Sequence, residues 1–402
     1  MLDWIELALK IYFCVCIVLI AYTYLFYPAI IWCCARFRVH EQAIDSSLVS
    51  SVSLVLVAHR EGEKILTKIR NLVRQVNQTG VIGEIIVVLD GIDSHTNEYS
   101  KELQGAFQES EVQLVELPCN CGKAVALSEG VKYAQQEILV FADVRQTWDS
   151  HALSRLVEAF RDPQVGAVSG DLVLNDSGGG ADGVGLYWRY EKWLRLQESQ
   201  FDSVIGVTGA ICAVRRKLFA GIPKGIILDD VYWPMKVIMS GYRVKHEPNA
   251  VAFDQLPHSA HDELRRKIRT LCGNFQILTS LPVILLPWKN RTSWQFISHK
   301  VLRLAVPWAL LGAFISSALI ATPLYRCMFF AQVFGYALVV LVMWTGTGSR
   351  CRILSAAVAF LLLNYAAWLA FWVWILGREH KCWTTVDYVP SPSETLQENL
   401  QH

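Results

Sequence analysis

Four long stretches of this chain contain no Asp, Glu, Lys or Arg, and they restrict its fold more than any other feature. They cover residues 11–35, 304–325, 327–349 and 353–377. About 20 consecutive apolar residues are enough for a helix to cross the hydrocarbon core of a bilayer. One such stretch is also compatible with a buried helix of a soluble protein, but four in one chain are not. We therefore predict four membrane-spanning helices, one before and three after a polar middle part.

The composition agrees with a membrane protein that also carries a folded polar domain. Apolar residues make up 53% of the 402 residues and charged residues 18%, against about 45–50% and about 25% in ordinary soluble proteins. Lys and Arg number 37 and Asp and Glu 36, which gives a formal net charge of +1. Nucleic-acid-binding proteins usually carry a large basic excess, so we expect no nucleic-acid partner.

Charges beside the first apolar stretch predict its orientation. Asp3 and Glu6 precede it, and acidic residues do not suit the basic start of a signal peptide. We therefore expect an uncleaved anchor. Arg36 and Arg38 follow the stretch, so the positive-inside rule places the polar middle in the cytoplasm. The cysteines show no disulfide pattern, which agrees with a reducing compartment.

Short apolar runs alternate with helical patterns in the polar middle. Residues 64–75 and 123–134 have the apolar spacing of helices with one buried face. Four runs are typical of buried strands: residues 52–57, 84–89, 112–117 and 138–142. Alternation of this kind predicts an α/β domain with a mainly parallel sheet and helices on both faces. Ligands of such sheets bind beyond the carboxyl ends of the strands.

Polar residues follow these predicted strands. Asp90 and Asp143 come after the second and the fourth, Gly122 and Lys123 open a helix, and Asp229–Asp230 form a later acidic pair. Oxygen ligands suit Mg²⁺ or Mn²⁺, and a helix N-terminus with a lysine suits phosphate. This set indicates a nucleotide diphosphate with a divalent cation. Taken alone, an Asp after a strand is more often a turn former or a helix cap, and Gly122–Lys123 is more often a helix start with a solvated lysine.

Taken together, these motifs resemble the family 2 glycosyltransferases, which are inverting GT-A enzymes that use nucleotide sugars. The layout is similar to the membrane synthases of hyaluronan, cellulose, chitin and poly-N-acetylglucosamine. The supporting stretches are VLVAHREGE, VVLDGIDSHT, GKAVALSEGVKYAQQEILVFADVRQ, GVTGAICAVRRKLF, ILDDVYWPMKVIMSGYRVKHEPNAVAF and RRKIRTLCGN. The resemblance implies a GT-A domain with a mainly parallel sheet, plus transmembrane and interfacial helices.

The same resemblance implies a role for particular residues. Asp230 corresponds to the general base, with Asp229 beside it, and Asp143 to the first metal ligand of the Asp-x-Asp motif. The residues implied to bind the donor are Ala58, His59, Glu61, Asp90, Lys123, Asp143, Arg266 and Arg269. The residues implied at the acceptor end are Thr208, Gly209 and Ala210, and an aromatic cluster adds Trp188 as an acceptor contact.

Two positions depart from the family pattern. The second place of the metal motif is Arg145, and an arginine cannot ligate a cation. Asp143 would therefore share Mg²⁺ or Mn²⁺ with water, diphosphate or another ligand. The Gln-x-x-Arg-Trp region reads Arg266 at its first place and Thr270 at its last. That tryptophan stacks on the acceptor sugar in the polymer synthases, so its loss weakens the prediction of a processive enzyme.

The resemblance implies an inverting enzyme that transfers a sugar from a UDP-sugar to a glycan or lipid-linked acceptor at the bacterial inner membrane. Three alternatives stay open: a processive polysaccharide synthase, with or without partner subunits for export; a single-addition lipid glycosyltransferase; and an inactive subunit that binds nucleotide sugar. All active versions require Asp90, Asp143 and Asp230 to converge on one pocket.

The chain is predicted to divide into five parts. Residues 275–288 are apolar but too short to span a bilayer, so they are expected to form an interfacial or re-entrant helix. The parts are a transmembrane anchor (1–38), a cytoplasmic GT-A domain (39–262), interfacial or amphipathic helices (263–302), three transmembrane helices (303–377) and a C-terminal tail (378–402).

Overall fold

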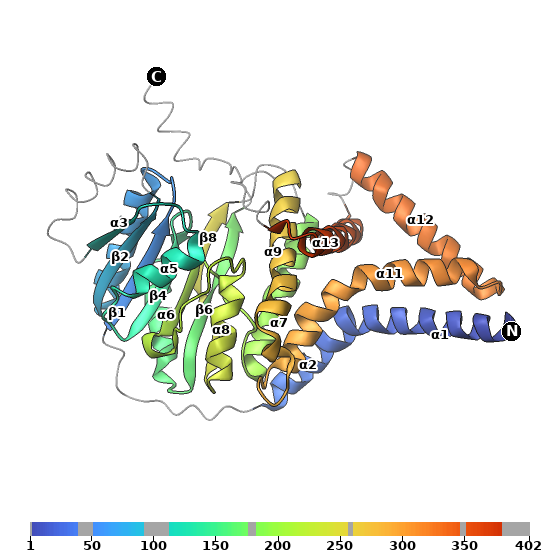
Figure 1. Cartoon of the computed structure of the whole chain (residues 1–402), viewed down its shortest axis with the longest axis horizontal. Coiled ribbons are helices and arrows are strands. Elements are labelled where there is room, and N and C mark those ends of the chain that lie inside the picture. Colours follow the sequence, from blue (N-terminus) through green and yellow to red (C-terminus); the bar gives the residue numbers. More distant parts are fainter. Residues whose placement is uncertain are drawn as a thin grey trace, which may run out of the picture.

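The computed structural model describes residues 2–38, 51–91, 112–175, 182–255, 260–345 and 351–379. An α/β domain forms one end of the molecule, and long helices extend from one side of it (Figure 1). The tail predicted at 378–402 lies outside the described residues except for its first two. The boundaries between the five predicted parts stay predictions.

One eight-stranded sheet forms the centre of the α/β domain, in the order β3-β2-β1-β4-β7-β6-β8-β5. β1 pairs in parallel with both β2 and β4, and β7 is antiparallel to β4. The four strands predicted from apolar runs are β1 to β4, so the mainly parallel sheet is confirmed. The strands are β1 (Ser51–Ala58), β2 (Ile82–Asp90), β3 (Val112–Leu117), β4 (Ile138–Asp143), β5 (Thr147–Trp148), β6 (Val165–Asn175), β7 (Ile211–Arg215) and β8 (Arg243–Gln255).

Helices cover both faces of the sheet because the strands alternate their buried side chains. In β1, Leu54 and Leu56 pack with one hydrophobic cluster and Val55 packs with the other. The first cluster includes side chains from α3 (Lys64–Thr79) and α6 (Ala152–Glu158). The second includes α5 (Lys123–Val131), α8 (Asp229–Met239) and α9 (Ala260–Ser280).

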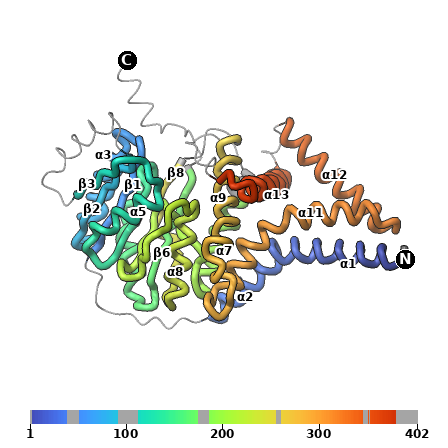
Figure 2. Tube along the Cα trace, in the orientation of Figure 1, coloured from blue at the N-terminus to red at the C-terminus, as the bar shows by residue number. Residues whose placement is uncertain are grey.

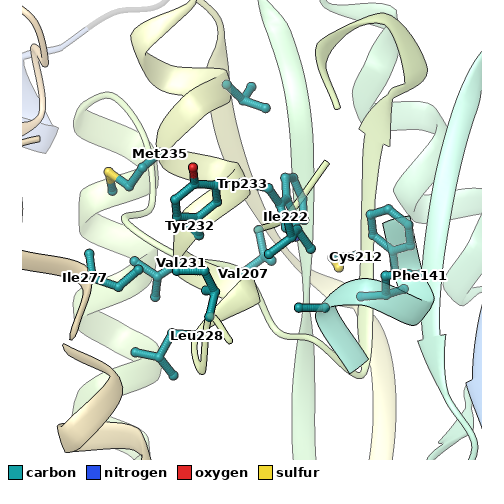
Figure 3. Close-up of a cluster of buried hydrophobic side chains, with 14 of the residues drawn as sticks. Phe141, Val207, Cys212, Ile222, Leu228, Val231, Tyr232, Trp233, Met235 and Ile277 are labelled. Carbon is teal, nitrogen blue, oxygen red and sulfur yellow. The ribbon is translucent and has the colours of Figure 1, made fainter. Parts of the chain in front are cut away.

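Helix α8 is anchored to the sheet through apolar side chains, as Figure 3 shows. Trp233 contacts Phe141 of β4 edge to face, with ring centroids 5.8 Å apart. Cys212 of β7 and Ile277 of α9 belong to the same buried cluster. The first turn of α8, which carries the acidic pair, is therefore held at a fixed place relative to the strand ends.

Four helices are long and apolar enough to cross a membrane, within the described residues. They confirm the four predicted segments, one before and three after the domain. The first runs through α1 (Leu2–Ala21), a π-helical turn η1 (Tyr22–Phe26) and α2 (Tyr27–Phe37). The second runs through α10 (Ser293–Phe296), a π-helical turn η5 (Ile297–Val301) and α11 (Leu302–Leu319). The others are α12 (Pro323–Thr345) and α13 (Arg352–Ile375).

The apolar helices do not form one parallel bundle. α1 and α11 lie side by side, whereas α13 is seen end-on and therefore crosses them (Figure 2). A side chain at Gly312 of α11 would lie 2.5 Å from the Tyr12 hydroxyl of α1, so glycine permits this close approach. α13 instead packs on α9, where Phe275 and Trp374 stack with centroids 5.4 Å apart.

Helix α7 (Asp182–Phe201) and helix α9 connect the domain to the membrane helices. The prediction that residues 275–288 form one interfacial helix is wrong. α9 continues to Ser280, and a separate 3-10 turn η4 covers Pro282–Leu285. Proline lacks an amide hydrogen and disfavours a helical residue before it, and Leu281 accordingly leaves the helical region, with φ −142° and ψ 57°.

Candidate active site

Asp90, at the end of β2, fixes the loop that leads into α5. Its carboxylate is buried and accepts backbone N–H groups from Cys121 at 2.7 Å and Gly122 at 2.9 Å. Gly122 has a φ of 86°, which glycine adopts without strain. Because both carboxylate oxygens hold the turn, Asp90 determines where Lys123 begins the next helix. Its contact with a nucleotide base stays a prediction.

His59 and Glu61, after β1, lie against the same loop. The Nδ1 atom of His59 lies 2.6 Å from the carbonyl oxygen of Asp90, and its Nε2 atom lies 3.1 Å from Asn120. The backbone N–H of His59 donates to Glu61 at 2.7 Å. Burial raises the pKa of the Glu61 carboxyl to about 7, against the opposing effect of that hydrogen bond. Ala58 is the buried last residue of β1, so these three predicted donor residues share one strand end.

Lys123 lies close to three carboxylates, those of Asp143, Asp229 and Asp230. Its ammonium donates to Asp143, at the end of β4, over 2.6 Å. Burial alone would lower the pKa of Lys123, but the carboxylates of Asp143, Asp229 and Asp230 outweigh it and raise the pKa above its ordinary value. A side chain at Gly209 would lie 3.2 Å from the Lys123 ammonium and 3.9 Å from Cβ of Asp230. Residues from β4, α5, α8 and the loop before β7 thus converge on this lysine.

Asp230 combines a buried, unpartnered carboxylate oxygen with a raised pKa. Its Oδ1 atom is buried and has no hydrogen-bond partner among the described residues. Burial and the neighbouring Asp229 raise the pKa of Asp230 to about 6, while Lys123, Lys300 and Arg195 oppose the rise. The N-cap of α8 is Leu228, so the acidic pair lies inside the first turn and does not cap the helix.

Three hydrogen bonds hold the predicted acceptor loop, residues 208–210. Thr208 donates its backbone N–H to Ser169 at 2.9 Å, and its hydroxyl accepts from Arg195 at 3.0 Å. The carbonyl oxygen of Ala210 accepts from the indole of Trp148 at 3.0 Å. The loop is therefore rigid where Gly209 faces Lys123 and Asp230.

Two predicted site residues, Arg266 and Trp188, have hydrogen bonds to residues outside this group. Arg266 donates to Glu263, three residues earlier in α9, at 3.1 Å, and Arg269 follows one turn later in the same helix. Trp188 of α7 donates to the carbonyl of Leu172 at 3.2 Å. Donor binding by the two arginines and acceptor contact by Trp188 stay predictions.

Arg145, at the second place of the metal motif, forms an ion pair with β8. It donates two hydrogen bonds to Asp254 of β8, at 2.8 and 2.7 Å. Within the described residues no three His, Cys, Asp or Glu side chains are grouped as a metal site. Mg²⁺ commonly uses one or two carboxylates together with substrate phosphates and water. Asp143 is a third exposed, and its chemistry therefore fits a cation shared with the donor diphosphate.

Sequence reasoning missed two cations that act on Asp230. Arg195 of α7 and Lys300 of η5 both lower the pKa of Asp230, against burial and Asp229, which raise it. Lys300 precedes the second apolar stretch by four residues. Ionisable groups at the edge of a membrane helix are a recognised sign of function, and that sign would have identified Lys300. Nothing in the local sequence marks Arg195.

Comparisons with known proteins agree with this geometry. The model of the family "Glycosyl transferase family 2" matches residues 53–222. The poly-β-1,6-N-acetyl-D-glucosamine synthase of Staphylococcus aureus is 23% identical over 254 residues, 58% of this chain and 57% of the relative. The synthase of Staphylococcus epidermidis is 24% identical over 277 residues, 64% of this chain and 60% of the relative. The chain thus spans less than two thirds of the length of these curated relatives.

A solved structure extends the likeness to the membrane part. The mannosyltransferase PcManGT from Pyrobaculum calidifontis, in complex with GDP-Man and Mn²⁺, superposes with a TM-score of 0.64 at 22% identity. The match covers 90% of this chain and 99% of that chain, which confirms the GT-A fold. Residues 53–222 therefore match the family 2 glycosyltransferases, in a membrane chain that resembles the poly-β-1,6-N-acetyl-D-glucosamine synthases.

Proposed function

We propose that this chain is an inverting membrane glycosyltransferase that moves a sugar from a UDP-sugar to a hydroxyl group of a glycan or lipid-linked acceptor. The observation that carries the proposal is the convergence of Asp143, Asp229 and Asp230 on Lys123. A second support is the family 2 domain over residues 53–222. The catalytic domain is proposed to face the cytoplasm at a bacterial inner membrane.

The reaction is a single displacement at C1 of the donor sugar. Asp230 takes the proton of the acceptor hydroxyl while that oxygen attacks C1 and the bond from C1 to the diphosphate oxygen breaks. A base with a pKa of about 6 is ionised at neutral pH and still accepts a proton. Lys123 and the N-terminus of α5 stabilise the negative charge that develops on the leaving diphosphate. One displacement inverts the anomeric centre.

The donor pocket is proposed to lie along the ends of β1 and β2. Ala58, His59, Glu61 and Asp90 would contact the base and ribose, as the family resemblance implies. Their hydrogen bonds tie β1, β2 and the loop before α5 into one unit. UDP is favoured over GDP by the resemblance to the polysaccharide synthases.

A divalent cation is proposed to bind Asp143 together with the donor diphosphate. Bound Mg²⁺ or Mn²⁺ would supply positive charge beside the leaving group. Excess EDTA should therefore reduce transfer by at least about tenfold, and added Mn²⁺ should restore it. Mn²⁺ binding in the presence of UDP, followed by electron paramagnetic resonance, should weaken in Asp143→Asn. Full activity in EDTA would contradict the proposed cation.

Transfer should depend on pH through Asp230. Its pKa of about 6 means that the carboxylate base is mostly protonated below that pH and ionised above it. The rate should therefore rise as pH rises through about 6 and then level. Initial rates between pH 5 and 8 at saturating donor test this expectation, and a rate that is flat over the range would remove Asp230 as the base.

Single addition is the better supported mode of transfer. Thr270 is found where the polymer synthases have their acceptor-stacking tryptophan. Arg266 forms an ion pair with Glu263. Membranes that contain the protein should release UDP from one UDP-sugar in a panel and yield a single-sugar product. A ladder of products would instead establish a processive synthase, and no release from any donor would favour an inactive binding subunit.

A further inference from the structure

A proline inside helix α8 leaves the backbone carbonyl of Asp230 without its usual helical donor. In an α-helix each carbonyl accepts from the amide four residues later. For Asp230 that residue is Pro234, which has no amide hydrogen. The carbonyl of Asp230 accepts instead from the backbone N–H of Val207, over 2.8 Å. The proposed base is therefore tied by its own backbone to the loop before β7.

The same loop packs closely against the first turn of α8. A Cβ atom added at Gly206 would lie 3.2 Å from the carbonyl oxygen of Asp230 and 3.2 Å from a methyl group of Val231. Val207 and Val231 belong to one buried cluster, and Figure 3 shows both. A shift of residues 206–208 would therefore also shift the backbone of Asp230.

Arg195 of α7 holds this loop on both sides of Val207. Its guanidinium donates to the carbonyl oxygen of Gly206 at 3.3 Å and to the hydroxyl of Thr208 at 3.0 Å. It also donates to the hydroxyl of Ser169 in β6 at 2.7 Å, and that hydroxyl accepts from the backbone N–H of Thr208 at 2.9 Å. Because a guanidinium carries its donors in one fixed plane, a single side chain connects β6 to two positions of the loop.

The charge of Arg195 also acts on Asp230. Burial lowers the pKa of Arg195, and four carboxylates of β6, α7 and α8 oppose that effect: Asp171, Glu191, Glu198 and Asp230. Arg195 in turn lowers the pKa of Asp230. The other charged groups that act on Asp230 are Asp229, which raises its pKa, and Lys123 and Lys300, which lower it. The geometry and the charge of Arg195 therefore both bear on the same carboxylate.

We propose that Arg195 is a positioning residue for the base: it holds residues 206–208, and these hold the backbone of Asp230 in place for the acceptor hydroxyl. The proposal rests on the proposed function and adds a residue that acts through the loop. The loop continues to Gly209, where an added Cβ would lie 3.2 Å from the Lys123 ammonium. A loop held by Arg195 would thus keep the base and the cation beside the leaving group at a constant separation.

The pH–rate profile separates the two effects of Arg195. Arg195→Met removes both the hydrogen bonds and the charge. Transfer at saturating donor should fall by about 10- to 100-fold, because the base is no longer held in position. The acid limb of the profile, where the rate rises with pH, should move to higher pH, because Asp230 loses a cation that lowers its pKa. UDP affinity should not change.

Arg195→Lys keeps the charge but not the fixed plane of donors. Its rate at saturating donor should also fall, whereas its acid limb should stay at the wild-type pH. A defect in folding alone would not divide the two variants in this way. Should Arg195→Met fail to fold, Arg195→Lys still tests whether the rate depends on the hydrogen bonds of the guanidinium.

Hydrogen–deuterium exchange tests the hold on the loop without any turnover. In the full-length protein in detergent, the amides of Val207 and Thr208 should exchange at least about tenfold faster in Arg195→Met than in the wild type. They should exchange faster in Arg195→Lys as well, by a smaller factor. Exchange is measured by mass spectrometry with fragmentation that resolves single amides.

Arg215→Met is the matched control for both measurements. Arg215 lies at the other end of β7, and its guanidinium donates to the carbonyl oxygens of Val165 and Phe160 at 2.9 Å each. Loss of these bonds should lower the melting temperature. The acid limb and the exchange of Val207 should not change, because Arg215 has no contact with the loop before β7.

Two results would overturn the proposal. One is unchanged exchange of Val207 in Arg195→Met. The other is an acid limb that does not move in Arg195→Met, together with a loss of rate that Arg215→Met reproduces. Failure of the glycosyltransferase proposal would look different: the wild type would consume no UDP-sugar, whereas Val207 would still exchange faster in the Arg195 variants.

Discussion

Asp230→Asn should lower sugar transfer by about 10²- to 10⁴-fold, the range that general acid–base catalysis usually contributes, and should leave UDP affinity unchanged. Asparagine keeps the size of the side chain but cannot accept the proton of the acceptor hydroxyl. The Oδ1 atom of Asp230 has no hydrogen-bond partner among the described residues, so the substitution breaks no contact there. Transfer is measured with labelled donor and UDP affinity by calorimetry.

Asp229→Asn is the matched control for this prediction. Asp229 raises the pKa of Asp230, so its removal should lower that pKa and move the acid limb of the pH–rate profile to lower pH. The variant should retain far more activity at neutral pH than Asp230→Asn. If the two variants lose equal activity and neither shifts the profile, the acidic pair acts as one binding element and Asp230 is not the base.

Lys123→Met should lower transfer by about 10²- to 10³-fold, as removal of a group that stabilises developing negative charge typically does. The loss has two causes. The leaving diphosphate loses a cation, and Asp230 loses one of the charges that hold its pKa down. Fewer molecules would then carry an ionised base at neutral pH. The pH–rate profile should accordingly move to higher pH, which a purely structural defect would not produce.

Two further lysine variants sharpen this test. Lys123→Arg should not restore full activity, because the ammonium lies so close to Gly209 that an added Cβ there would be 3.2 Å from it, which leaves little room for a larger guanidinium. Lys132 lies just after the end of the same helix, where it pairs with Glu129 at the surface, and Lys132→Met should retain full activity. Restoration by arginine would mean that any nearby positive charge is sufficient.

The local parts of the fold were predictable from the sequence, because each depends on neighbours in the chain. Continuous apolar runs identified β1 to β4, and strand ends identified Asp90 and Asp143. Parallel strands bring such ends to one edge, so the grouping around Lys123 followed from topology. The prediction of a separate helix at 275–288 was wrong because its first residues belong to α9, which starts at Ala260 and ends just before Pro282. The apolar pattern of 275–288 does not show that a helix continues into it from earlier residues.

The remaining features depend on partners that lie far apart in the chain. Arg145 and Asp254 are 109 residues apart, and Glu191 and Arg303 are 112 residues apart. No spacing rule links such pairs. The sequence could therefore show that Arg145 is not a metal ligand, but it could not show that Arg145 pairs with Asp254. The same limit hid the effect of Lys300 and Arg195 on Asp230, although the position of Lys300 at the edge of an apolar stretch was visible.

The first apolar helix contributes to the packing of the α/β domain. The hydroxyl of Tyr27, a fully buried residue of α2, donates to the equally buried carboxylate of Glu198 in the domain. Cutting the chain after residue 38 would strip that donor from a carboxylate hidden from water. The remaining chain, which keeps the other three apolar helices, would then be expected to lose its packing around Glu198. The first helix is therefore a structural part of the domain and not a detachable anchor.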